Sequence, residues 1–270
     1  MPPRFSPRWP FLLAFLLVLG PSLAGCATTG VNAGDFNLVS LDEEWQLGRQ
    51  LEADVNRQVR LVNDAALERY VEQMGQQIVA QTELRQLPWR FHVVQDDAIN
   101  AFNIPGGVVY VNTGLIARAG SASELAGVLA HEISHGIARH GTERLTTQYG
   151  ISIVAGLVLG QDPGLVEQIA AQIVATGAIA RYSRGAEREA DDLGVRYMAG
   201  AGWDPEGMAR MFQRLMAEGG GGGGIPFFST HPTTEERIAN VRAAARSVNR
   251  SGLRTDDAGF ANARSRARRY

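Results

Sequence analysis

The stretch AHEISHGIARH, residues 130–140, places two histidines and a glutamate among apolar neighbours. His131 and His135 are four residues apart and therefore share one face of a helix, where their imidazole nitrogens can reach one zinc ion at about 2.0–2.1 Å. Glu132 projects about 100° around the same helix, so its carboxylate can take a proton from a metal-activated water without ligating the metal. The spacing predicts a zinc-dependent hydrolytic site. The pattern alone leaves open a pair of hydrogen-bonded core histidines, because HExxH also occurs in unrelated helices.

A third protein ligand is expected on a second helix. Residue 141, where metzincins carry their third histidine, is glycine, and His140 lies one residue short. The stretch GAEREADD instead offers Glu187 and Asp191 on one helical face. Glu187 can ligate zinc, and Asp191 can accept a hydrogen bond from the free nitrogen of a ligand histidine. The other charged residues of this helix are expected on a solvated face: Arg188, Glu189, Asp192 and Arg196.

Hydrophobic periodicity and capping signals predict the elements that position these residues. The helix with the two histidines is expected to begin at a capping box of Ser121 and Glu124 and to end in the cationic turn of Arg139, His140 and Gly141. Other helices are expected at 42–62, 64–82, 184–199, from Asp204, and from a capping box of Thr233 and Glu236. Strands at 90–95 and within 100–116 are expected to form a small antiparallel sheet. Residues 151–180 are interpreted as a buried helix, with contact to an apolar substrate or a membrane surface as the alternative.

Composition limits the class of protein. The chain has 270 residues, 45% of them hydrophobic, which is enough for one domain with a substantial core. A formal net charge of −2 gives no general reason to expect binding to nucleic acid. The single cysteine, Cys26, excludes an intramolecular disulfide and a cysteine-rich metal site within this sequence.

The first 26 residues are typical of an export signal. Arg4 and Arg8 precede the apolar run FLLAFLLVLG, which is too short for a permanent membrane helix, and LAGC follows at 23–26. This ending resembles a bacterial lipobox, which implies lipidation of Cys26. The next residue is Ala27 and not the aspartate that keeps such lipoproteins in the inner membrane, so the resemblance implies a location on the periplasmic face of the outer membrane. An ordinary secretory signal is the alternative. We predict a signal peptide at 1–25, a tether at 26–40, a metalloprotease domain at 41–248 and a basic, disordered tail at 249–270.

Four motifs together resemble one family: NAFNIPGGVVYVNTGL from 100, LAHEISHGIARH from 129, SRGAEREAD from 183 and STHPTTEERI from 229. They resemble the zinc metallopeptidases that include the CAAX prenyl proteases, HtpX, BepA and LoiP, with the LoiP-type periplasmic lipoproteins most similar in size and lipidation. The resemblance implies a gluzincin fold with one zinc ion. The roles that it implies are metal ligands for His131, His135 and Glu187, the general base for Glu132, and support of a ligand for Asp191.

The same resemblance draws attention to His231 and Pro232, followed by Arg237. His231 is expected either to occupy the fourth zinc position in a closed state or to stabilise the oxyanion, and Arg237 to assist at the oxyanion. The strand VVYVNTG is implied to be the edge to which an extended substrate adds. The six glycines from Gly219 to Gly224 are either a hinge for the His231 segment or only a slack connector.

The sequence therefore predicts an α+β fold, mainly helical, with a gluzincin-type metalloprotease domain. The expected activity is that of a lipid-anchored zinc endopeptidase that cleaves misfolded or stalled envelope and outer-membrane proteins. One alternative is a zinc-bearing periplasmic chaperone or assembly factor with little proteolysis. Another is an inactive structural lipoprotein without stoichiometric zinc.

Overall fold

The computed structural model describes residues 31, 37, 39–179, 181–218, 225–232 and 234–270. The predicted signal peptide, Cys26, most of the predicted tether, Gly219 to Gly224 and Thr233 lie outside these residues. Within the described residues, no helix has the length and apolar character needed to cross a membrane.

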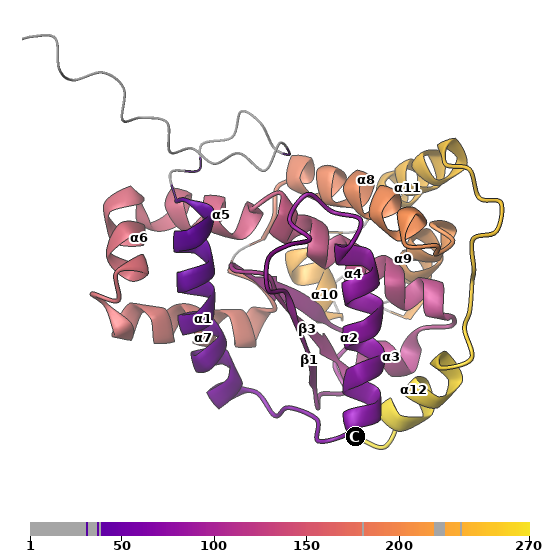
Figure 1. Cartoon of the computed structure of the whole chain (residues 1–270), viewed down its shortest axis with the longest axis horizontal. Helices are drawn as coiled ribbons and strands as arrows, with labels where there is room; N and C mark the ends of the chain where they lie inside the picture. The colour runs from indigo at the N-terminus through magenta and orange to yellow at the C-terminus, as the bar shows by residue number, and fades with distance from the viewer. Residues whose placement is uncertain (1–30, 32–36, 38, 180, 219–224, 233) are drawn as a thin grey trace, which may run out of the picture.

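The described part is mainly helical and contains one small sheet (Figure 1). The strands are β1 (Arg90–Val94), β2 (Ala101–Ile104) and β3 (Val108–Asn112). The helices are α1 (Leu41–Gln58), α2 (Ala65–Val79), α3 (Thr113–Arg118), α4 (Ala122–Ile137), α5 (His140–Tyr149), α6 (Ile151–Val158), α7 (Pro163–Thr176), α8 (Arg184–Gly200), α9 (Glu206–Glu218), α10 (Pro226–Thr230), α11 (Glu235–Ser247) and α12 (Phe260–Ala267). The predicted α+β, mainly helical class is confirmed.

The sheet is mixed, and the prediction of a purely antiparallel sheet is wrong. Its strand order is β1-β3-β2, with β3 parallel to β1 and antiparallel to β2. After β1 the chain passes to the far edge to form β2, then turns back through Gly106 and Gly107 into the centre of the sheet. β1 and β2 are therefore consecutive in sequence but are not neighbours in the sheet.

The sheet separates two apolar clusters, because alternate residues of a strand point to opposite faces. Val109 and Val111 of β3 belong to the cluster that includes residues of α2, α4 and α9. Val108 and Tyr110 of the same strand belong to the cluster that includes residues of α1, α6 and α7. Figure 1 shows α1, α6 and α7 gathered on one side of the strands.

The segment 151–180 forms α6 and α7 and contributes Val154, Leu157, Ile169 and Ile173 to the second cluster. The interpretation of a buried helix holds for this face of the pair. Three large apolar side chains of the same region are exposed: Ile151, Ile153 and Leu159.

Helix α4 is the centre of the molecule, and all of its residues are buried. It packs against α2, α8, α9 and β2. Its contact with α9 requires glycine on both helices, since a Cβ on Gly127 would lie 2.6 Å from Met208 Cα and one on Gly207 would lie 2.3 Å from Ser123 O. This close approach fixes the position of the helix that carries His131 and His135.

The two ends of α4 differ in part from the prediction. Ser121 Oγ accepts from the Glu124 N–H at 3.3 Å, as expected, but Glu124 Oε2 accepts from Gly120 N–H and not from that of Ser121. At the other end the chain breaks at Arg139, not at a glycine: Arg139 has φ 60°, in the left-handed region, and α5 starts at the next residue. A buried ion pair of 2.6 Å from Arg139 Nε to Glu44 Oε2 of α1 holds this turn.

The C-terminal region is folded, and the expectation of a disordered tail from 249 is wrong. Phe260, Ala263 and Ala267 form a short buried stripe on α12, which packs against α2 and α3. Asp64, at the start of α2, pairs with two arginines of this region at 2.9 and 3.2 Å. The start of α11 also differs, because Thr234 caps it through the Arg237 N–H, one residue later than predicted.

Candidate metal centre

Four buried side chains converge beside the C-terminal half of α4. They are His131 and His135 from α4, Glu187 from α8, and His231, which caps α10. A ligand atom of each lies within 4.8 Å of those of the others. The structure thus brings together the three predicted ligands and His231, which come from segments up to 100 residues apart in the chain.

The spacing of these atoms fits a zinc ion. His131 Nε2 lies 3.1 Å from His135 Nε2 and 3.2 Å from His231 Nδ1. Glu187 Oε1 lies 3.0 Å from His231 Nδ1 and 3.5 Å from His135 Nε2. A tetrahedral zinc site with bonds of about 2.0–2.1 Å has ligand–ligand edges of about 3.4 Å. The observed distances scatter around this value, and the donors are of the types that zinc prefers; which of the four bind it at rest stays a prediction.

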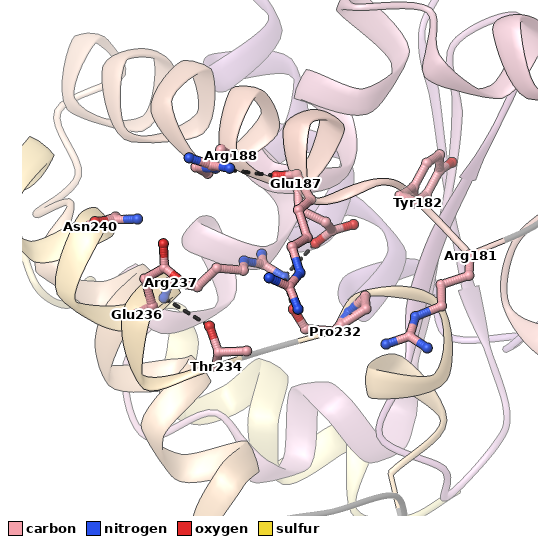
Figure 2. A pocket seen from close by; sticks show the side chains of 10 residues that line it. Arg181, Tyr182, Glu187, Arg188, Pro232, Thr234, Glu236, Arg237 and Asn240 are labelled. Atoms are coloured by element: carbon pink, nitrogen blue, oxygen red, sulfur yellow. Dashed lines mark hydrogen bonds and ion pairs between the residues drawn. The ribbon is translucent and has the colours of Figure 1, made fainter.

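The protonation states also suit metal binding. Burial lowers the pKa of His135 well below its ordinary value, so that its imidazole is neutral, as a ligand must be. Burial opposes ionisation of Glu187, but attraction to His231, hydrogen bonds from His135 and His231, and the charge of Arg237 hold its pKa well below the ordinary value. Glu187 is therefore a carboxylate. Figure 2 shows it directed toward the guanidinium of Arg237.

Glu132 is fully buried next to this cluster. Its Oε1 lies 3.5 Å from His231 Nε2, and the backbone N–H of Asn103 in β2 also acts on its carboxylate. Burial raises the pKa of Glu132, although His231 and His131 partly oppose the shift. A buried carboxyl group needs hydrogen-bond donors, and a water held at the metal would supply a further one. The placement fits the predicted general base, whose role stays a prediction.

His131 is oriented by an acidic residue. Its Nδ1 lies 2.9 Å from Asp191 Oδ1, where the predicted support of a ligand histidine requires the carboxylate. Arg237 donates to both oxygens of Asp191, at 2.7 and 2.8 Å, and to the Pro232 carbonyl at 3.0 Å. Arg237 also pairs with Glu187. The guanidinium thus contacts two carboxylates at the centre and positions them, and its expected role at the oxyanion stays a prediction.

His135 is oriented by His140, the first residue of α5. Its Nδ1 lies 2.9 Å from Nδ1 of His140, and His140 Nε2 lies 3.3 Å from Glu189 Oε2. If His135 Nε2 faces the metal, His135 Nδ1 carries the proton and donates it to His140 Nδ1, so that His140 Nε2 is protonated and donates to Glu189. The chain of contacts therefore allows one consistent set of tautomers.

The left-handed turn at Arg139 makes this contact possible, because it starts α5 at a new angle and returns His140 to the α4 histidines. From the sequence, His140 is excluded as a direct ligand and Glu189 is predicted on a solvated face, and the Glu189 side chain is 31% exposed. A basic residue next to a histidine gives no sign of positive φ. The sequence feature that could have indicated a role for His140 is its position in the same apolar stretch as the predicted ligands His131 and His135.

The strand nearest the centre is β2, and this corrects the predicted substrate edge. The predicted strand VVYVNTG contains β3, which is central and paired on both sides. The ring of Tyr182 stacks on His135 with centroids 4.0 Å apart, and its hydroxyl donates to Asn103 Oδ1 of β2 at 3.4 Å. The edge strand nearest the metal centre is thus β2, all of whose residues are buried.

Comparisons with known proteins agree with this geometry. The family model described as "Peptidase family M48" matches residues 65–245. The mitochondrial metalloendopeptidase OMA1 of Schizosaccharomyces pombe is 32% identical over 216 residues, covering 78% of this chain and 63% of OMA1. Beta-barrel assembly-enhancing proteases are 29% identical over 254 residues in Yersinia pestis (87% of this chain, 52% of that protein) and 27% over 245 residues in Escherichia coli K12 (84% and 49%). The chain spans about half to three fifths of the length of these relatives.

Proposed function

Because this chain belongs to peptidase family M48, we propose that it is a zinc endopeptidase of the bacterial cell envelope that cleaves misfolded or stalled envelope and outer-membrane proteins. Membership confirms the predicted family resemblance, the metallopeptidase class and zinc as the cofactor. The observation that carries the proposal is the position of Glu132, fully buried beside four side chains that could hold a metal ion. The envelope location, the lipid anchor at Cys26 and the substrates are part of the proposal.

The reaction would divide between the ion and the chain. Zinc held by His131, His135 and Glu187 supplies Lewis-acid chemistry, which lowers the pKa of water toward ~7 and polarises a peptide carbonyl. Glu132 takes the proton of the attacking water on a carboxylate oxygen and passes it to the leaving amine. Asp191 keeps the imidazole of His131 in the orientation in which Nε2 faces the centre.

His231 would act as a gate at this site. With His231 included, the cluster offers four protein ligands, whereas catalytic zinc sites keep one position for water or substrate. His231 is fully buried and stacks on Phe227 with ring centroids 4.6 Å apart. We therefore expect it to withdraw when a peptide enters, after which its imidazole can hydrogen-bond to the oxyanion.

The proposed substrates follow from the edge strand. β2 is buried in this structure, so we propose that an extended peptide reaches it when the site opens and pairs with it through main-chain hydrogen bonds, which select for extended chain more than for side-chain identity. Unfolded proteins present such segments. Support for an envelope role comes from the export-type N-terminus and from similarity to proteins named beta-barrel assembly-enhancing proteases.

Glu132→Gln tests the proposal. It should lower hydrolysis of an unfolded substrate such as casein by about 10²- to 10⁴-fold, while zinc stays near one ion per chain, because Glu132 is not in the ligand cluster. Hydrolysis at the wild-type rate would overturn the proposal. In a protein-assembly assay, activity retained by Glu132→Gln but lost with His135→Ala would favour the chaperone alternative, which the fully buried His231 keeps open. Purified protein without zinc would favour the structural lipoprotein.

A further inference from the structure

A cavity of about 330 Å³ lies against the outer side of the metal centre (Figure 2). It is bounded by the first turn of α8, by the segment before it, and by the chain from Pro232 into α11. Its lining residues are Arg181, Tyr182, Arg184, Glu187, Arg188, Pro232, Thr234, Glu236, Arg237 and Asn240.

The charges in this cavity are unbalanced. Arg237 is neutralised by its contacts with Asp191 and Glu187. Three other arginines, at 181, 184 and 188, are exposed. Arg188 also donates from Nε to the Arg184 carbonyl at 3.5 Å, and its charge acts on the carboxylate of Asp192. The lining contains four arginines and two glutamates, and it carries a net positive charge even when Asp191, which contacts Arg237 from outside the lining, is included.

The N-terminus of α8 adds to this positive field. Arg184 is the first residue of this 17-residue helix, and Ser183 caps it. A helix N-terminus carries a partial positive charge that favours anions in its first turn. The three guanidinium groups and the helix end therefore act in the same direction.

The cavity adjoins the metal centre directly. Glu187 lines it and is also one of the four metal-ligating residues. Tyr182 lines it and stacks on His135. Arg184 and Glu187 are three residues apart on α8, which is less than one helical turn of about 5.4 Å. An extended peptide covers this length in about two residues, because it advances about 3.3 Å per residue. A group bound in the cavity is thus within a few residues of the scissile bond.

We propose that this arginine pocket, defined by Arg181, Arg184 and Arg188, is a substrate subsite that binds a carboxylate of the peptide a few residues from the cleaved bond. The inference rests on the proposed endopeptidase function and gives it a preference for acidic segments. Guanidinium groups suit this ligand because they bind carboxylates through paired, charge-assisted hydrogen bonds. A lysine or arginine of the substrate would instead meet like charge.

The test measures binding without cleavage. The full-length, zinc-loaded Glu132→Gln chain is titrated into fluorescent peptides of one extended sequence, amidated at the C-terminus, in which a single Glu or Gln is moved along the peptide. At one position the Glu peptide should bind about five- to tenfold more tightly than its Gln partner. A parallel set with a free C-terminus distinguishes a side-chain carboxylate from the terminal one.

Variants locate the effect. Arg184→Ala combined with Arg188→Ala should abolish the preference, whereas the double lysine variant at these positions should retain part of it. Arg85→Ala, at an exposed arginine outside the pocket, should leave it unchanged. Zinc content and circular dichroism check the fold of each variant, and Arg181→Ala provides a milder change if the double alanine variant does not fold.

The outcomes are distinct. Equal binding of the Glu and Gln peptides at every position, no binding of either, or a preference that survives in the double alanine variant overturns the subsite. If the wild type cleaves no peptide while the Glu132→Gln chain still prefers Glu, the endopeptidase proposal fails, and the arginine pocket stands only as a site that binds peptide carboxylates. In the wild type, the Glu peptide should have a lower KM than the Gln peptide and the same kcat, because the contact is remote from the reacting atoms.

Discussion

His131 and His135 lie one turn apart on α4, but their outer nitrogens meet different surroundings. His131 Nδ1 faces Asp191, a buried carboxylate that Arg237 holds by two hydrogen bonds. His135 Nδ1 faces His140, which leads to a partly exposed glutamate. One ligand is thus fixed by a buried ion pair and the other by a second histidine whose own partner is a partly exposed carboxylate.

This difference separates two ways to orient a ligand. The Asp191–Arg237 pair also joins α8 to α11 and so contributes to the fold, but each charge depends on the other, because a buried charge without its partner is costly. Replacement of the His140 imidazole leaves no buried charge without a partner. We therefore expect changes near His131 to affect both folding and metal affinity, and changes near His135 to affect mainly metal affinity.

The largest effect should come from Asp191→Leu. It leaves Arg237 with one buried carboxylate instead of two and removes the acceptor of His131, so the free energy of unfolding should fall by about 3–5 kcal/mol. Zinc affinity should fall by at least about 10- to 100-fold. Urea unfolding and competition with a chelator measure the two quantities.

Asp191→Asn is the matched control, since it keeps the shape and one acceptor oxygen, and it should lie between the wild type and the leucine variant. An Asp191→Leu chain that unfolds at the wild-type urea concentration would contradict the structural half of the comparison.

Replacement of His140 should separate affinity from stability. His140→Leu keeps most of the volume but offers no acceptor to His135 Nδ1, so zinc affinity should fall by about 10- to 100-fold. His140→Asn can place its amide oxygen near the former Nδ1 and should recover most of this loss. The absorption spectrum of the cobalt-substituted protein reports directly on the ligand field at His135.

A loss of affinity that is equal in the leucine and asparagine variants would mean that His140 contributes only packing. A fall in stability as large as that of Asp191→Leu would remove the contrast between the two histidines.

The parts of the site that could be predicted are those set by helical periodicity. The spacing of His131 with His135, and of Glu187 with Asp191, places each pair on one face, and both pairs lie in helices. The helices predicted at 42–62 and 184–199 are observed at Leu41–Gln58 and Arg184–Gly200, because local capping and an apolar stripe decide them.

The parts that could not be predicted depend on contacts between distant residues. The turn at Arg139 is held by Glu44, 95 residues earlier, and without it His140 would not return to His135. The order of the strands follows from packing on both faces of the sheet. The alternation of residue types within one strand does not reveal which strand lies beside it. The stripe on α12 has only Phe260 and two alanines, too weak a pattern to separate a docked helix from a polar tail.

The smallest effect should come from Glu189→Gln. Glu189 lies 3.3 Å from His140 Nε2 and its side chain is 31% exposed, so water can replace it as an acceptor and the interaction is worth little. Zinc affinity should change by no more than about threefold. Salt gives an independent check: raising it to 1 M shortens the Debye length to about 3 Å, which should imitate Glu189→Gln in the wild type and leave the fully buried Asp191 contact unaffected. A tenfold loss in Glu189→Gln that high salt does not reproduce would show that the His135 side is also fixed by charge, and the contrast between the two ligands would then fail.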